Sequence, residues 1–223
     1  MAHQNFIDII KNEFTFLEND GYQLRIEDRN VWYEKNTKKE GFRIGFSWTE
    51  YDCIWISGLT ANKRFNIVEK LINPIINVDL INLYTIYISP NVDYIPESLN
   101  YTESNGKINF EISTYEESLL FVDFMKSFYD KTAKRFYEEY KNLENVNVWL
   151  DKNDINNHVN LITSAGNTMM LRKLILMKLN NDKKFEDLFF RYKDFLIKKK
   201  SENESPYVDM FNTFQQLIPF FEK

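Results

Sequence analysis

Apolar and polar residues alternate along four consecutive runs between residues 20 and 58. A β-strand turns successive side chains to opposite faces, so each run predicts a strand with one buried face. In the clearest run the residues predicted to point inward are large and apolar: Phe42, Ile44, Phe46 and Trp48. The fourth run, residues 51–57, is apolar on both faces, which is typical of a central strand. Short connections between the runs favour antiparallel neighbours.

Helical spacing of apolar residues precedes and follows these runs. An N-terminal helix from Phe6 to Leu17 is predicted to end at Gly21, a residue that suits a helix C-terminus. After the fourth run, Thr60 is expected to cap a helix over 61–73 that stops at Pro74.

The remainder of the chain predicts short strands and then long helices. β-branched and aromatic residues favour strands at 84–88 and 110–113. Thr114 and Glu117 have the spacing of a capping box. Apolar stripes predict helices that begin near Thr114, Asn167, Phe185 and Ser205. We therefore expect an α+β fold: an N-terminal helix, an antiparallel meander of about four to six strands and a helical C-terminal half, with residues 1–113 and 114–223 packed as one unit.

Composition narrows the class of protein. The 223 residues are 43% hydrophobic and 16% aromatic, so aromatic side chains are expected to dominate the core. The N-terminus lacks a secretion signal and no apolar run reaches the ~18 residues of a membrane span. A single cysteine excludes an intramolecular disulfide. These features predict a cytoplasmic protein with no membrane partner.

Few residues offer catalytic or metal-binding chemistry. Cys53 lies in the most apolar run and is interpreted as a packed thiol, and the isolated His158 as a loop residue. Two histidines and one cysteine cannot form a standard zinc site, and phosphate-binding loops are absent. Adjacent glutamates at 116–117 and 138–139 point about 100° apart on a helix, so they do not converge on one reacting atom. We expect no cofactor and no metal.

The distribution of charge indicates where a partner could bind. Seven acids and one base lie between Asp93 and Asp123, whereas ten bases and four acids lie between Arg172 and Lys200. The run Lys198–Lys200 suits the C-terminus of a helix, and the sequence pI of about 5.3 argues against nucleic-acid binding. The acidic stretch contains tyrosines, which are typical of protein interfaces. We call its candidate residues the acidic surface: Asp93, Tyr94, Glu97, Tyr101, Glu103 and Glu116.

Two alternatives to the acidic surface remain open. The acidic stretch could be only a solvated edge. The outward face of the sheet around Arg25, Arg43 and Ser47 is the next candidate for partner binding.

The first 60 residues resemble a known class of bacterial domains. The residues that carry the resemblance are Phe14-x-Phe16-Leu17-x3-Gly21-Tyr22, Val31-x-Tyr33 and Phe42-x-Ile44-Gly45-Phe46-Ser47-Trp48. This pattern is similar to small uncharacterised bacterial α+β domains, some of which are immunity proteins of polymorphic toxin systems. The resemblance implies a cytoplasmic protein that binds and blocks one toxin, and it assigns no catalytic residue.

These observations favour a non-enzymatic protein-binding module, most readily an immunity-type protein that neutralises a basic toxin domain. One alternative is a hydrolase- or transferase-like enzyme that uses carboxylates and His158. Another is a scaffold or adaptor protein. The sequence leaves the oligomeric state open.

Overall fold

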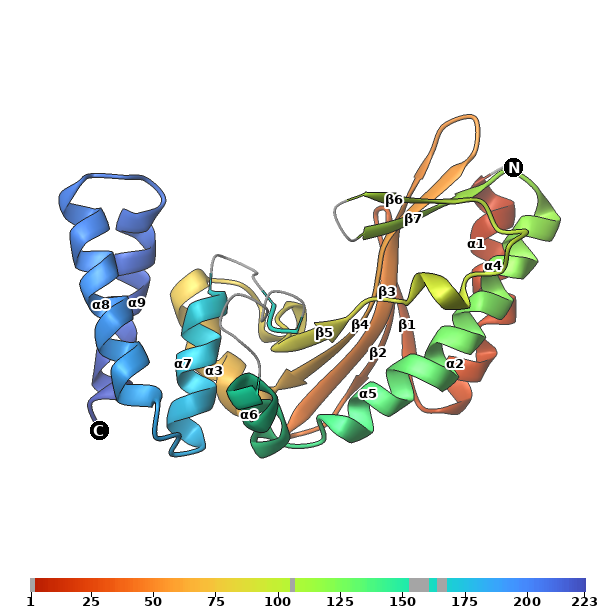
Figure 1. Ribbon diagram of the computed structural model, residues 1–223. Helices are drawn as coiled ribbons and strands as arrows, with labels where there is room; N and C mark the ends of the chain where they lie inside the picture. Colours follow the sequence, from red (N-terminus) through yellow and green to blue (C-terminus); the bar gives the residue numbers. More distant parts are fainter. Residues whose placement is uncertain (1–2, 105–106, 153–160, 164–167) are drawn as a thin grey trace. The chain divides into compact units, whose positions relative to one another are not determined.

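The four alternating runs form neighbouring strands of one sheet, and the predicted antiparallel meander is confirmed (Figure 1). The computed structural model describes residues 3–104, 107–152, 161–163 and 168–223. The strands are β1 Gln23–Glu27, β2 Asn30–Asn36, β3 Glu40–Glu50, β4 Ile54–Phe65, β5 Ile86–Ile88, β6 Tyr101–Ser104 and β7 Lys107–Ile112. Their order is β1-β2-β3-β4-β7-β6, and β5 pairs with β4 outside this path.

The helices complete the predicted α+β fold. They are α1 His3–Glu13, α2 Thr15–Asn19, α3 Asn66–Ile76, α4 Tyr115–Phe128, α5 Lys134–Glu139, α6 Leu143–Lys152, α7 Met169–Leu179, α8 Phe185–Ser201 and α9 Tyr207–Phe221. Short 3₁₀ turns η1 and η2 cover Leu80–Asn82 and Val92–Tyr94, and a π-helical turn, η3, covers Tyr129–Ala133. No helix in the described part of the chain is long and apolar enough to cross a membrane.

The chain folds into two compact units that interleave in sequence. Unit 1 comprises residues 1–37, 41–63 and 87–139. Unit 2 comprises residues 38–40, 64–86 and 140–223. This division differs from the expected halves 1–113 and 114–223, because each unit is assembled from segments that are far apart in the sequence.

Unit 1 is a sheet with helices on one face. Helices α1, α2, α4 and α5 lie along this face (Figure 1). Leu24, Tyr33 and Ile44 align across β1, β2 and β3, as the alternation predicts. Phe46 is 2% exposed, and its ring meets that of Phe121 on α4 edge-on at 5.3 Å between centroids. The core of unit 1 is therefore largely aromatic.

The end of β4 corrects the prediction of a helix capped by Thr60. The strand continues to Phe65, and α3 begins only at Asn66. Burial alternates through this stretch in the strand period, with Leu59, Ala61 and Lys63 buried and the residues between them half-buried. The strand period was missed in the sequence because Lys63 is polar and was not recognised as a buried position. Pro74 also lies inside α3, and the helix ends at Asn77 in the left-handed conformation (φ 51°).

Unit 2 contains helix α3 and the helices from α6 to α9. Helix α7 is buried on all sides from Leu171 to Met177. Helices α8 and α9 lie side by side and pack through rings such as Phe189 and Phe214, 5.6 Å apart (Figure 1). Within α8, Phe195 is 40% exposed. The helix expected to begin near Ser205 starts at Tyr207, and the residue before it, Pro206, provides no side-chain cap. Asn167, near which α7 was expected to begin, lies outside the described residues.

Candidate functional site

The start of α4 holds one glutamate in place and leaves its neighbour at the surface. The Thr114 hydroxyl accepts a hydrogen bond from the Glu117 amide at 3.1 Å, and the Glu117 carboxylate accepts from the Thr114 amide at 2.9 Å. The predicted capping box is therefore confirmed. Asn100, which directly precedes β6, donates to the same carboxylate at 3.3 Å. Glu117 thus stabilises the fold, whereas Glu116 is exposed.

The β6–β7 hairpin, η2 and the exposed turn at Glu97 between them present the other members of the acidic surface. All four residues of β6 are exposed, including Tyr101 and Glu103. The Asn91 side chain accepts from the Asp93 amide at 3.0 Å and so shapes the turn that carries Asp93 and Tyr94. The hairpin and η2 both lie beside α4: η2 packs against it, and Asn100 hydrogen bonds to it.

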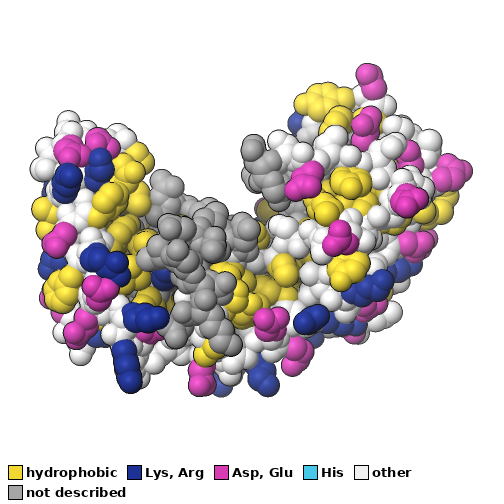
Figure 2. Space-filling view, in the orientation of Figure 1, with side chains coloured by type: hydrophobic (Ala, Val, Ile, Leu, Met, Phe, Trp, Pro, Cys, Tyr) yellow, Lys and Arg dark blue, Asp and Glu magenta, His cyan; other side chains and the backbone are white. Residues whose placement is uncertain are grey.

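Every residue of the predicted acidic surface lies at the surface of unit 1. Tyr94 is 49% exposed and Tyr101 is 42% exposed, and Tyr115, at the start of α4, is 54% exposed. None of the four acidic members forms an ion pair with a cation whose side chain the structure describes. Figure 2 shows Asp and Glu side chains interspersed with hydrophobic ones on the right of the view. This arrangement suits contact with a basic, partly apolar surface.

The outward face of the sheet is the alternative surface for partner binding. Its side chains contact one another within unit 1. The Trp32 ring lies between the guanidinium groups of Arg25 and Arg43, at 4.5 and 4.4 Å from its centroid. Arg43 is 8% exposed and donates to the Glu34 carboxylate at 2.7 Å through Nε. The Ser47 hydroxyl donates to the Asn30 side chain at 2.6 Å. These contacts give the residues a structural role.

A second feature of unit 1 is an open pocket of about 350 Å³ that sequence reasoning did not find. Its aromatic lining comes from Tyr22, Phe42, Tyr129 and Tyr137, and its charged rim from Asp20, Lys35, Lys134 and Glu138. Nothing local in the sequence marks these residues, because they come from the α2–β1 turn, β2, β3, η3 and α5.

The turn after α2 positions Tyr22 in this pocket. The Gly21 amide donates to the Glu18 carbonyl at 2.9 Å and the Tyr22 amide to the Leu17 carbonyl at 3.1 Å. This pair of bonds is a Schellman motif, which requires the left-handed conformation found at Gly21 (φ 84°). The prediction that Gly21 ends the N-terminal helical segment is confirmed. Tyr22 and Leu17 are both buried beside the motif.

Tyr129 enters the pocket from the π-helical turn η3. Its hydroxyl donates to the Asp20 carboxylate at 2.7 Å, and the Lys134 ammonium lies 3.2 Å from the same carboxylate. The Tyr137 hydroxyl donates to the Arg43 carbonyl at 3.1 Å. The Tyr22 ring meets that of Tyr129 edge-on, at 5.9 Å between centroids. Single π turns within helices often occur at functional sites, which makes this pocket a candidate.

The resolved pKa shifts in the pocket all move away from neutrality. Burial raises the pKa of Tyr22 to about 12, and burial with the hydrogen bond to Asp20 raises that of Tyr129. The hydrogen bonds from Tyr129 and Lys134 lower the pKa of Asp20. The hydrogen bond to Asp130 raises the pKa of Lys134. A general acid or base works best with a pKa near the working pH, so these four groups suit binding better than proton transfer.

Cys53 and His158 are the two other residues considered for catalysis. Cys53 is buried, and burial together with Glu111, whose carboxylate lies 3.6 Å from the thiol, raises its pKa. A raised pKa is the opposite of what a nucleophilic thiolate needs, and the interpretation of Cys53 as a packed thiol is confirmed. His158 lies outside the described residues. Among the described residues, no group of His, Cys, Asp and Glu side chains could hold a metal ion.

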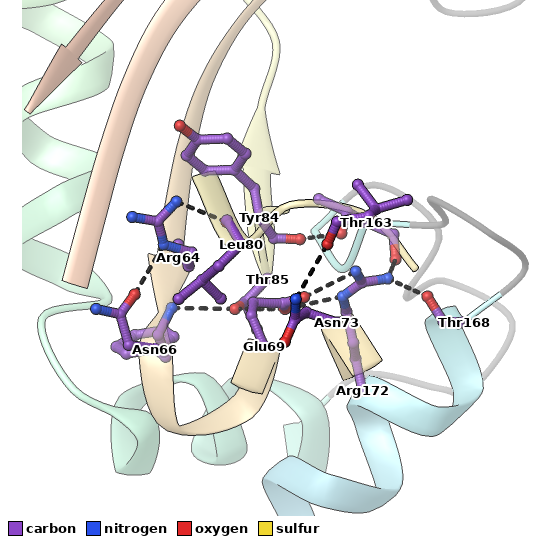
Figure 3. A network of polar contacts seen from close by, with 12 residues as sticks. Arg64, Asn66, Glu69, Asn73, Leu80, Tyr84, Thr85, Thr163, Thr168 and Arg172 are labelled. Atoms are coloured by element: carbon purple, nitrogen blue, oxygen red, sulfur yellow. Dashed lines mark hydrogen bonds and ion pairs between the residues drawn. The ribbon is translucent and has the colours of Figure 1, made fainter. Parts of the chain in front are cut away.

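Unit 2 contains a buried polar network that the sequence did not reveal (Figure 3). The Arg172 guanidinium donates to both carboxylate oxygens of Glu69, at 2.9 and 2.8 Å, and both side chains are fully buried. The Thr85 hydroxyl donates to Glu69 at 2.8 Å, and Arg172 also donates to the Thr168 hydroxyl and to the Thr163 carbonyl. The pair joins α3 to α7. The sequence contained one signal of this network, an arginine among the apolar residues of the segment that forms α7.

The fold and these sites define an α+β protein with an acidic, tyrosine-bearing surface and a separate aromatic pocket in unit 1. The chain matches no protein-family model. No curated protein and no solved structure is significantly similar to it.

Proposed function

We propose that this protein is a non-enzymatic protein-binding module whose acidic surface binds a basic protein partner. The exposure of the acidic surface carries the proposal. Its carboxylates form no ion pair with a described cation, so their negative charge remains available to a partner. The half-exposed rings of Tyr94 and Tyr101 add contact area beside these charges.

The physical roles of the two residue types differ. Carboxylates attract a basic protein over distance and speed its encounter. Tyrosines supply a large contact area with little loss of side-chain entropy, and they are enriched among residues that dominate binding energy. Mutating the carboxylates should therefore act mainly on the association rate, and mutating the tyrosines mainly on the dissociation rate.

We further infer that the partner is a toxin and that this protein neutralises it in the cytoplasm as an immunity-type protein. The support is the resemblance of the first 60 residues to immunity domains. Neutralisation by direct binding needs an exposed surface and no catalytic centre. The acidic surface meets this requirement, and the shifted pKa values around the pocket do not favour an acid–base enzyme there.

The experiment is co-expression in a bacterial host with the toxin domain encoded beside this gene, followed by binding kinetics between the purified proteins across salt concentrations. We expect rescue of growth, and an association rate that falls as salt rises, because exposed charges are screened beyond about 8 Å at physiological ionic strength. The charge-reversal variant Asp93→Lys, Glu97→Lys, Glu103→Lys should lose most of the association rate and retain its dissociation rate.

A matched control changes the same net charge elsewhere. Glu18, Glu50 and Asp194 are exposed acids outside the acidic surface, and the triple lysine variant at these positions should bind nearly as the natural protein does. Equal loss in both variants would show that net charge, rather than the acidic surface, governs binding. Failure to rescue growth, or the absence of a toxin gene beside this one, would contradict the immunity function.

A further inference from the structure

The open pocket of unit 1 has an aromatic wall and a charged rim. Tyr22 and Tyr129 are 6% and 5% exposed, and their rings meet edge-on at 5.9 Å. Phe42 and Tyr137 are half-buried and also meet edge-on, at 5.0 Å. The volume of about 350 Å³ lies at the lower end of the range of about 300–1,000 Å³ found for small-molecule sites. A single aromatic ring with a short polar group suits this space.

Two charges on the rim already have partners. The Lys134 ammonium lies 3.2 Å from the Asp20 carboxylate and 2.8 Å from that of Asp130. Asp20 also accepts the hydrogen bond from Tyr129. These groups are matched within the protein, and they hold η3 and the start of α5 against the turn after α2.

The other two rim charges remain available to a ligand. The Lys35 ammonium donates to the Asp20 carbonyl at 2.8 Å and lies 5.9 Å from the centroid of the Tyr22 ring. Among the described residues, no carboxylate lies within ion-pair distance of Lys35, and no cation lies within that distance of Glu138. The rim thus offers one ammonium and one carboxylate beside an aromatic lining.

We propose that this pocket binds a small zwitterionic aromatic molecule of the aromatic α-amino acid class. The ligand's ring packs against the tyrosine and phenylalanine rings, an arrangement that favours aromatic pairs. Its carboxylate accepts a charge-assisted hydrogen bond from Lys35, and its ammonium donates one to Glu138. A ligand with a single charge leaves one rim group without a partner. No bond is made or broken, so the site is a binding site that is independent of the acidic surface.

The test measures the affinity of three probes by calorimetry: L-phenylalanine, 3-phenylpropionate without the ammonium, and phenethylamine without the carboxylate. We expect L-phenylalanine to bind about 10-fold more tightly than either analogue, the size of one charge-assisted hydrogen bond. Lys35→Met should weaken L-phenylalanine and 3-phenylpropionate about 10-fold and leave phenethylamine unchanged. Glu138→Gln should weaken L-phenylalanine and phenethylamine and leave 3-phenylpropionate unchanged.

The controls are Lys11→Met and Glu50→Gln, which change exposed residues of the same types outside the pocket and should leave all three affinities unchanged. Thermal unfolding of each variant should match that of the natural protein, because the rim groups are exposed. Absence of saturable L-phenylalanine binding would overturn the proposal. Equal loss of all three probes in both pocket variants would also overturn it, because the two charges would then not recognise opposite ends of the ligand.

Discussion

The cores of the two units are held together by different interactions. In unit 1 the core is a continuous cluster of apolar side chains, in which Phe121 contacts the rings of Phe14, Phe46 and Phe110. Unit 2 also packs aromatic rings between α8 and α9, but it encloses in addition the fully buried ion pair of Glu69 and Arg172. Apolar burial is non-directional, whereas a buried ion pair is favourable only in one geometry. The stability of unit 1 should therefore fall when a core residue is replaced by a polar one, and it should change little when apolar residues of similar volume are exchanged. The stability of unit 2 should depend strongly on the pair Glu69 and Arg172.

Charged residues that are counted together along the sequence differ in their surroundings between the two units. Arg172 and Lys173 contribute to the excess of bases between residues 172 and 200, yet both are buried. Lys199 forms ion pairs with Glu202 and Glu204 beyond the end of α8. The carboxylates of the acidic surface lie outside, on unit 1. Part of the basic half of the charge asymmetry is thus buried or paired, whereas the carboxylates of the acidic surface are all exposed.

Breaking the buried ion pair should give the largest effect. Arg172→Met leaves the Glu69 carboxylate buried without its partner, and we expect a loss of about 3–5 kcal/mol in the free energy of unfolding, measured in urea. The matched control is Arg191→Met, which removes an exposed ion pair with Asp187 and should cost less than about 1 kcal/mol. The double variant Glu69→Leu, Arg172→Met should recover most of the loss. Equal losses in the two single variants would contradict the special role of the buried pair.

Truncating the aromatic core should have an effect of similar size in unit 1. Phe46→Ala removes a ring that contacts Phe6, Phe14 and Phe121, and we expect a loss of about 3–5 kcal/mol. Hydrogen exchange should accelerate in β2 and β3. The control Phe190→Ala removes a ring that is 56% exposed and should change stability by no more than about 0.5 kcal/mol. A loss below about 1 kcal/mol for Phe46→Ala would show that this ring is not central to the core.

Crowding the outward face of the sheet should have a smaller effect. A Cβ atom added at Gly45 would lie 2.5 Å from Cδ1 of Trp32 and 2.5 Å from the Val31 carbonyl oxygen. We expect Gly45→Ala to cost about 1–3 kcal/mol, because the tryptophan ring and the β2 backbone must both shift. Urea unfolding measures the loss, and tryptophan fluorescence should report a changed environment. An unchanged stability would mean that β2 and β3 separate easily.

The smallest expected effect is the contribution of Cys53 to the change of stability with pH. Burial raises the pKa of its thiol, so folding favours the protonated form. Its stabilising contribution is therefore fully present below the pKa of an unfolded thiol, about 8.5, and is lost as pH rises through the higher folded-state value. A thiol reagent should react slowly with the native protein near pH 8 and rapidly after denaturation. Fast native labelling would contradict this assignment and restore the nucleophile hypothesis.

The sequence predicted the sheet well where one face is buried and the other is polar. The alternation at Phe42, Ile44, Phe46 and Trp48 fixes the faces of β3, because a shift of one residue would reverse all of them. The same logic missed β6, since all four of its residues are exposed and carry no alternation. It also missed α6, whose buried residues are few, such as Val146 and Leu150.

The candidate sites were predictable only in part. Charge and tyrosine content placed the acidic surface outside, because isolated carboxylates are costly to bury. Pairing between Glu69 and Arg172 joins positions 103 residues apart and leaves no local pattern. The aromatic pocket likewise combines Tyr22 with Tyr129, whose adjacency depends on the tertiary packing of unit 1.

The π-helical turn at Tyr129–Ala133 makes chain length itself a constraint on unit 1. A π turn accommodates one more residue than an α-helical turn, and each residue of an α-helix advances the side chains by about 100°. Deleting Asp130 would remove this extra residue and allow an uninterrupted α-helix from α4 into α5, with the flanking helices kept in nearly the same rotation. The backbone at Tyr129 would change, because the wide turn begins at this residue. We therefore expect the deletion to weaken the hydrogen bond from the Tyr129 hydroxyl to Asp20, and variants that keep the pocket to keep the number of residues in this turn.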